Sequence, residues 1–179
     1  MEGNDAWLCQ GDIFDRVPVL DVTVGAAGAL TASLQPGPAV LLTHDCAMDK
    51  VNPDGTLRLE RFQFARLRSI QSLQDHQVAS MRGARGTVGP FEFLWLGEVN
   101  GHGESFIYLS DPYYLPSTFF APTFVQYDDR EPDGSPSQAR ATPGANDSRI
   151  GRLRPAEIDL LRLKILAFWT RLKPAPPTV

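Results

Sequence analysis

The sequence has few of the residues that build metal centres and disulfide frameworks. Among its 179 residues there are two cysteines, Cys9 and Cys46, and 3 histidines. Two thiols exclude a disulfide framework, although a single bridge between them remains possible. No CxxC or HxxxH pair supplies two ligands from one turn, so we expect no metal site and no cofactor.

Long hydrophobic runs and phosphate-binding motifs are also missing. No stretch approaches the roughly 20 apolar residues of a membrane span, and no apolar run follows the acidic segment Met1 to Asp5. We therefore expect no secretory signal, no membrane attachment and a cytoplasmic protein with reduced thiols. The absence of a phosphate loop, a dinucleotide fingerprint and a serine-hydrolase elbow excludes the enzymes that depend on those motifs.

Charge is unevenly distributed, although the net charge of −4 is small. The segment from Arg149 to Lys173 holds seven cations and two anions, so it carries +5 and the remainder carries about −9. A basic segment on an acidic body predicts a docking surface for RNA or for an acidic protein partner, and the alternative is a solvated helix face. The binding residues predicted on this surface are Arg149, Arg152, Arg154, Arg162 and Lys164.

The composition indicates a mainly β fold. The chain has 15 glycines and 15 prolines, which favour short strands and many turns over a helical bundle. Residues 1–173 suffice for one hydrophobic core but not for two. We predict a single α+β domain in which about five to seven strands form a bent, barrel-like antiparallel sheet. The expected strands are residues 17–24, 38–43, 57–67, 91–96, 105–109 and an irregular strand over 112–125.

The remaining segments are predicted to be loops and helices. Residues 25–37 are rich in Gly, Ala and Ser, and 127–148 in Asp, Gly, Pro, Ser and Asn. We expect a mobile loop in the first case and an exposed or disordered loop in the second. Helical spacing of apolar residues predicts a short surface helix over 69–81. The same spacing predicts a C-terminal amphipathic helix over 155–172, and a tail follows at 174–179.

The order of the first segments carries a family resemblance. Gly11-Asp12-Ile13 leads into the first strand, a glycine-rich stretch precedes the run Pro38 to Thr43, and the next long strand is Leu57 to Leu67. This order is similar to the N-terminal half of PemK/MazF-like proteins, small SH3-like barrels that include toxin endoribonucleases. The similarity covers roughly residues 10–68 and implies a PemK-like barrel.

The catalytic positions of that family are occupied differently here. Those ribonucleases carry an arginine directly before the Pro-Ala-Val strand, where this chain has Gly37. They carry Thr or Ser at the end of the following strand, where this chain has Leu67 and Arg68. A cation at the reacting phosphate makes the largest electrostatic contribution to such catalysis. The resemblance therefore predicts the fold rather than ribonuclease activity.

One dense group of reactive residue types, Thr43-His44-Asp45-Cys46, directly follows an apolar run. Side chains presented where a strand ends in a loop are often functional. In a first interpretation, His44, Asp45 and Cys46 are the candidate catalytic residues, with Cys46 a nucleophile whose thiolate is favoured by His44. His44 and Cys46 then share one face of a continuing strand, and Asp45 points away from both.

Two other interpretations of this group remain open. In one, His44 and Cys46 bind zinc, which needs about four ligands. In the other, Asp45 caps the loop by accepting backbone N–H bonds, Cys46 is a small buried residue, and His44 is a partly buried hydrogen-bonding side chain. The further zinc ligands in the first of these would come from Cys9, Asp49, His76 or His102.

Together these observations predict a small regulatory protein of bacterial or phage type. It would bind a protein or RNA partner through the barrel face and the basic helix, without catalysis. The alternative is an enzyme, either an endoribonuclease-type toxin with relocated catalytic residues or a thiol-dependent enzyme centred on His44 and Cys46. The sequence does not determine the oligomeric state.

Overall fold

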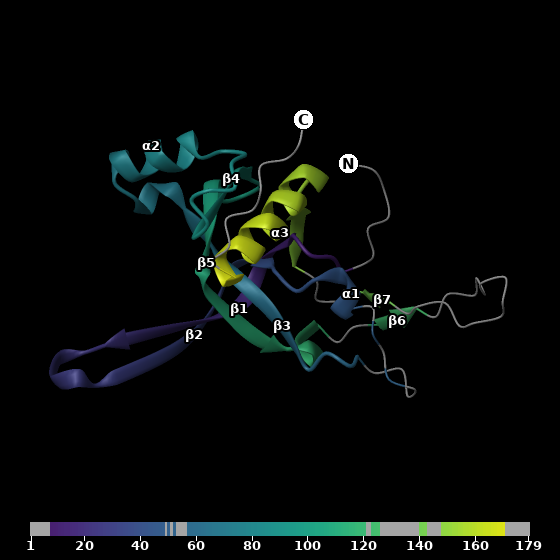
Figure 1. Cartoon of the computed structure of the whole chain (residues 1–179). Coiled ribbons are helices and arrows are strands. Elements are labelled where there is room, and N and C mark those ends of the chain that lie inside the picture. Colours follow the sequence, from purple (N-terminus) through teal and green to yellow (C-terminus); the bar gives the residue numbers. More distant parts are fainter. Residues whose placement is uncertain are drawn as a thin grey trace.

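The computed structural model describes residues 8–48, 50, 52, 57–120, 123–125, 140–142 and 148–170. Its centre is a six-stranded antiparallel sheet with the strand order β4-β5-β3-β2-β1-β8 (Figure 1). These strands are β1 (Asp12–Val24), β2 (Leu30–Leu41), β3 (Arg61–Ser69), β4 (Phe93–Val99), β5 (Gly103–Pro116) and β8 (Arg149–Arg152). β6 (Thr123–Val125) and β7 (Arg140–Thr142) pair as a separate two-stranded sheet.

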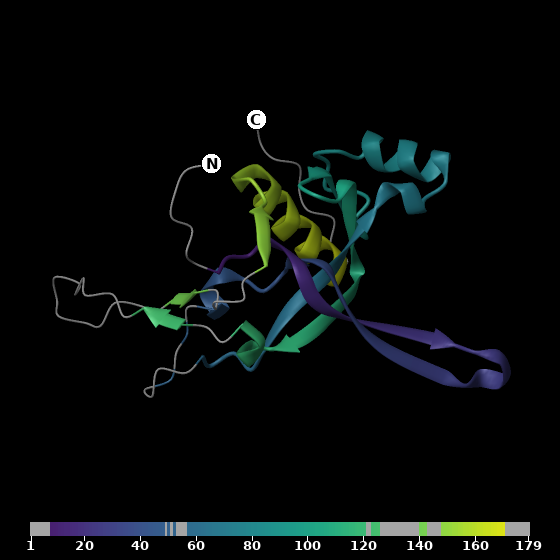
Figure 2. The ribbon, with the colours of Figure 1, turned by 180° about the vertical axis from the view of Figure 1, so that it is seen from behind.

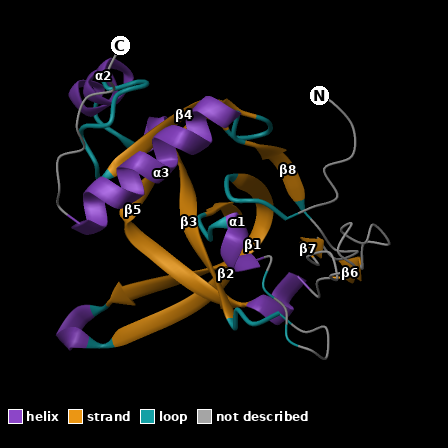
Figure 3. Cartoon of the chain, turned by 45° about the vertical axis from the view of Figure 1, so that its right-hand side comes forward, coloured by secondary structure: helices purple, strands orange, loops and turns teal. Residues whose placement is uncertain are grey.

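Three α-helices accompany the sheet in the described ranges. They are α1 (Asp45–Met48), α2 (Asp75–Gly83) and α3 (Pro155–Thr170), and α3 crosses one face of the sheet (Figure 3). Proline suits the first position of α3 because its missing N–H has no partner there. The Glu157 side chain accepts the backbone N–H of Arg154 at 2.8 Å, which caps the start of this helix. No helix in these ranges is long and apolar enough to cross a membrane.

Both faces of the central strands are buried. Along β2 and just beyond it, Ala39 and Leu41 pack with Phe14, while Val40 and Leu42 pack on the opposite face with Leu161 of α3. Alternate residues of a strand point to opposite faces, so a continuous apolar run becomes a strand covered on both sides. The strand predicted over 38–43 thus corresponds to the end of β2, which stops at Leu41.

The outcome for the other predicted elements is mixed. The strands β4 and β5, the helix α2 and the C-terminal helix α3 are present, but α2 begins at Asp75 rather than at Ser69. β3 begins at Arg61 rather than at Leu57, and its register with β5 shifts between Ala65 and Leu67. Of the loop predicted over 127–148, only β7 and Ser148 lie within the described residues. The tail at 174–179 lies outside them.

The prediction of a mobile loop over residues 25–37 is wrong for residues 30–37, which belong to β2. β2 begins at Leu30 and continues the hairpin with β1 in unbroken register from Val17 paired with Gly37 to Val24 paired with Leu30. Only a short 3₁₀ turn at Ala26–Gly28 separates the two strands, and Gly28 takes the left-handed conformation there, with φ of 76°. The small residues of β2 have low strand propensity on their own, but the register of β1 supplies their partners.

The sheet is not closed. β4 and β8 are its two edges, so the mainly β architecture is confirmed but the closed SH3-like barrel is not. Residues of both edge strands line one cavity of about 680 Å³, with the first turn of α3 beside it. We call this space the seam cavity.

A buried carboxylate holds β8 to β1. Asp12 is completely buried, and its two oxygens accept hydrogen bonds from Arg152 of β8. Arg149 donates to the same carboxylate at 3.1 Å, as does the Cys9 amide at 2.8 Å. A buried charge is tolerated only when it is paired and hydrogen-bonded in this way. The Gly-Asp-Ile entry of β1 therefore has a structural role.

We expect Asp12→Asn to lower the free energy of unfolding by about 3 kcal/mol. The change removes a buried negative charge that pairs with two partly buried guanidinium groups, which is costly. Asp111→Asn is the matched control, because its side chain is 70% exposed and, among the described residues, pairs only with Arg68 across the surface. The control should change stability by less than about 1 kcal/mol. Urea denaturation measures both, and equal effects would contradict the role assigned to Asp12.

Candidate functional site

The chain turns from β2 into α1 at His44. The Nδ1 atom of His44 accepts the backbone N–H of Cys46 at 3.2 Å and lies 2.9 Å from the Cys46 thiol sulfur. His44 therefore caps the start of α1 with its ring. Because Nδ1 acts as an acceptor, the neutral ring carries its proton on Nε2. That N–H is the one His44 can offer to a ligand.

Asp45 connects three segments that are distant in the sequence. One carboxylate oxygen accepts the Gln10 backbone N–H at 2.7 Å, and the other accepts a guanidinium N–H of Arg162 at 2.9 Å. Arg162 also donates to the side-chain oxygen of Gln10 at 2.8 Å. Asp45 thus accepts a backbone N–H, as the third interpretation expects, but from the segment before β1. Within the described part of the chain, no hydrogen bond joins it to His44.

These contacts shape a cleft of about 460 Å³ between the end of β2, the start of β3 and α3. Its lining includes the polar and cationic side chains of His44, Arg61 and Arg162. The rest of the lining is partly aliphatic. The lining residues are Gln10, Leu42, Thr43, His44, Leu59, Arg61, Gln63, Tyr114, Arg162, Ile165 and Leu166.

Hydrogen bonds hold the polar side chains of the cleft in place. The Thr43 hydroxyl oxygen accepts the Gln63 backbone N–H at 2.7 Å, and Gln63 donates through its side chain to the Tyr114 hydroxyl at 3.2 Å. Gln10 donates to the Leu42 carbonyl at 2.7 Å. Each bond joins neighbouring strands or loops, so the cleft keeps its shape without a ligand.

Arg61 is a cation of the cleft that is absent from the predicted binding residues. It is the first residue of β3, its side chain is exposed, and no ion pair involves it within the described ranges. Its only signal in the sequence is that Glu60 and Arg61 interrupt an apolar pattern, which is common on exposed strand ends. Nothing local indicates that it lines the same cleft as Arg162, 101 positions further along the chain.

The predicted basic surface is largely neutralised within the chain. Arg149 and Arg152 pair with Asp12, and Arg154 pairs with Glu157. Lys164 is 1% exposed and donates to the carbonyls of Val88 at 3.0 Å and Pro90 at 2.6 Å. Of the five predicted binding residues, only Arg162 lines the cleft, so a docking surface built from all five is not supported.

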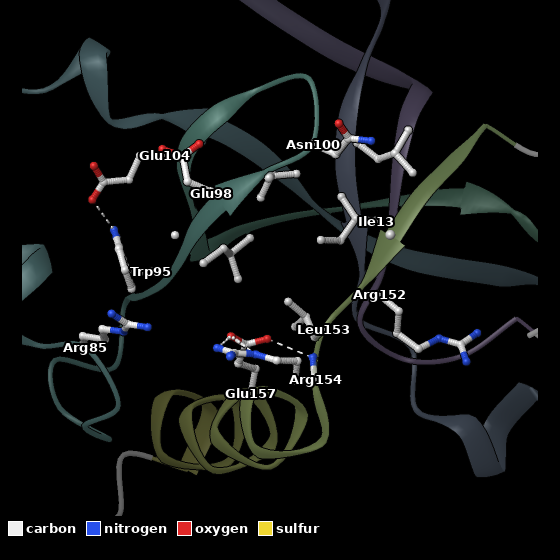
Figure 4. A pocket seen from close by; sticks show the side chains of 15 residues that line it. Ile13, Arg85, Trp95, Glu98, Asn100, Glu104, Arg152, Leu153, Arg154 and Glu157 are labelled. Atoms are coloured by element: carbon white, nitrogen blue, oxygen red, sulfur yellow. Dashed lines mark hydrogen bonds and ion pairs between the residues drawn. The ribbon is translucent and has the colours of Figure 1, made fainter. Parts of the chain in front are cut away.

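Arg152 and Arg154 line the seam cavity instead (Figure 4). Arg154 is paired with Glu157, while Glu104 accepts the Trp95 indole N–H at 3.0 Å and pairs with Arg82. Arg85 lies over the Trp95 ring at 4.7 Å, a cation–π contact. Most charged groups of this cavity thus already have partners, whereas Arg61 in the cleft has none among the described residues. We therefore take the cleft as the candidate site.

The geometry gives little support to zinc binding or to Cys46 as a nucleophile. No group of three or more His, Cys, Asp or Glu residues that could hold a metal ion occurs in the described ranges. His102 is bound to Asp15 at 3.0 Å, and His76 lies exposed on α2. Cys46 is exposed rather than buried, and it does not line the cleft.

Comparison with known proteins adds no identification. No protein-family model matches the sequence, and no curated protein matches it significantly. The function is therefore argued from the cleft itself.

Burial lowers the pKa of Lys164 to about 8 from its ordinary value of 10.5, and Glu92 opposes part of this shift. Between these two pH values the unfolded chain binds more protons than the folded one. The free energy of unfolding should therefore rise with pH across this window, by up to about 3 kcal/mol. Lys164→Met should lack this rise, whereas Lys50→Met, at an exposed position, should keep it. Thermal denaturation between pH 8 and 10.5 measures the difference, and parallel profiles for wild type and Lys164→Met would contradict it.

Proposed function

We propose that this protein is a non-enzymatic interaction protein that binds a protein partner in the cleft. The bound segment presents a carboxylate next to aliphatic side chains. The observation that carries the proposal is that Arg61, Arg162 and His44 line one cleft of about 460 Å³ together with aliphatic side chains. A site of this size holds one or two side chains of a partner.

The charges of the cleft favour an acidic group. Asp45 balances one cation, because it pairs with Arg162. Arg61 remains as an uncompensated guanidinium among the described residues, and a guanidinium forms two parallel hydrogen bonds with a carboxylate. The second partner of Arg162, Asp159, is 3.8 Å away and 73% exposed, so it contributes little. A carboxylate placed here would accept charge-assisted hydrogen bonds from guanidinium groups that line the cleft.

The lining favours a protein segment over RNA. Leu59, Ile165 and Leu166 match aliphatic side chains, whereas bases stack on aromatic rings. Among the described lining residues, Tyr114 and the His44 imidazole are the only aromatic rings. The net charge of −4 also disfavours a polyanion over a segment with a single carboxylate.

RNA cleavage is the second candidate function, and one observation favours it. Arg61 and Arg162 supply cations next to His44, although Gly37 stands at the position of the family's arginine. The Nδ1 atom of His44 is engaged with Cys46, so only Nε2 would exchange protons with a substrate. A histidine can act as a general acid or base, and cations can stabilise the charge on a transferring phosphoryl group.

The binding proposal is tested by selecting ligands for the full chain from a phage-displayed library of random peptides. We expect selected peptides to share an Asp or Glu next to Leu, Ile or Val. Arg61→Gln should weaken their binding by about 10- to 100-fold, because a hydrogen-bonded charge pair is lost. Arg58→Gln is the matched control, since Arg58 is exposed and does not line the cleft. Fluorescence polarisation of labelled peptides measures both affinities.

Three results would overturn the proposal. The first is a set of selected peptides without carboxylates, and the second is equal affinity for wild type and Arg61→Gln. The third is cleavage of single-stranded RNA by the wild type that His44→Ala abolishes, which would establish the ribonuclease alternative. Iodoacetamide alkylation of Cys46 faster than that of a free model thiol would support the thiol-dependent alternative.

A further inference from the structure

The outer parts of β1 and β2 form a hairpin that projects beyond the rest of the sheet (Figures 1 and 2). β1 pairs with β8 only at Asp12–Phe14, and β2 pairs with β3 only at Ala39–Leu41. From residue 19 to residue 35, each strand therefore pairs only with the other in the described part of the chain. We call residues 19–35 the arm.

One face of the arm is apolar. Residues two apart on a strand share a face, and the register places the apolar residues of β1 directly opposite those of β2. The five larger side chains of this face are 56% to 73% exposed. The apolar face consists of Leu20, Val22, Val24, Leu30, Ala32 and Leu34.

The opposite face of the arm is mainly polar and carries the only charged residue of the arm. Asp21 lies there opposite Ser33, and its carboxylate pairs with Arg66 of β3. No other residue of the arm is ionisable. Monomeric proteins usually protect exposed strands with lysines, prolines or inward charges. The apolar face of the arm carries no such protection, so it has the features of an interface.

We propose that two copies of this chain associate by packing the apolar faces of their arms together around a two-fold axis. An aliphatic face without charges or hydrogen-bonding side chains is matched by another aliphatic face, and a second copy presents an identical one. Two such faces pack as layers about 10 Å apart, which removes the six apolar side chains of each arm from water.

The extent of the apolar face fits such an interface. Monomers rarely expose contiguous apolar patches larger than a few hundred Å², and a standard interface buries roughly 800 Å² per partner. Five large aliphatic side chains at more than half exposure supply a large part of that area. The arm projects from the sheet, so it does not bury this face on its own body (Figure 2).

Sedimentation velocity tests the association on the full chain, at loading concentrations from about 1 to 100 µM, where interfaces of this size assemble. We expect a dimer for the wild type. Val22→Lys should raise the dissociation constant by about 100-fold or more, because it places a charge in the apolar layer. Thr23→Lys is the matched control, since Thr23 is the next residue and lies exposed on the opposite face. It should leave the dimer intact.

Leu34→Lys, on the other strand, gives a second test and should behave as Val22→Lys does. Both positions are exposed, so the circular dichroism spectra of the folded variants should remain those of the wild type. A wild type that is monomeric at every concentration would overturn the proposal. So would equal dissociation by Thr23→Lys. The arm and the cleft share no residue, so Val22→Lys should bind the selected peptides as the wild type does, and the two proposals can fail separately.

Discussion

The guanidinium of Arg162 connects the segments that build the candidate site. It binds Gln10 before β1 and Asp45 on α1, and Asp45 in turn binds the Gln10 backbone. These contacts hold α3 against the turn that presents His44. An arginine suits this place because its planar group donates in several directions at once and keeps its charge when partly buried. This contact therefore holds α3 and the polar end of β2 together where both line the cleft.

Pairing decides which charges of this chain are available to a partner. The basic C-terminal segment has a net charge of +5, yet those of its arginines that the structure describes bind Asp12, Asp45 and Glu157, and Lys164 is buried against two carbonyls. A charge count along the sequence cannot register these contacts, because the partners of Arg149 and Arg152 lie more than 130 positions away. Arg61, which belongs to no charged run, is the cation left exposed in the cleft.

The sequence predicts the elements that are specified locally. Period-2 alternation and turn residues predict the hairpin of β4 and β5, and helical spacing predicts α3, because each pattern reflects a face that must be buried. The strand from Leu30 to Gly37 could not be recognised in this way. Its small residues resemble a loop, and only pairing with β1 makes it a strand. The capping of α1 by His44 and the position of Arg61 also depend on tertiary contacts.

The family resemblance also rests on local motifs, which do not show the tertiary contacts that form the site. Its Gly-Asp-Ile entry and its Pro-Ala-Val strand are present, and Asp12 gives the first a structural reason. At Gly37, where the resemblance would place an arginine, a β-carbon would lie 3.2 Å from the buried side chain of Val19. Close packing at the base of the arm thus accounts for glycine at that position. The cations that line the cleft with His44 belong to β3 and α3.

The central claim is that the cleft binds a carboxylate beside aliphatic groups, and a crystal structure of the chain with a selected peptide tests it most directly. The account predicts the peptide carboxylate within hydrogen-bonding distance of Arg61 or Arg162, with an aliphatic side chain against Ile165 and Leu166. A peptide bound elsewhere, with the cleft empty, would contradict it.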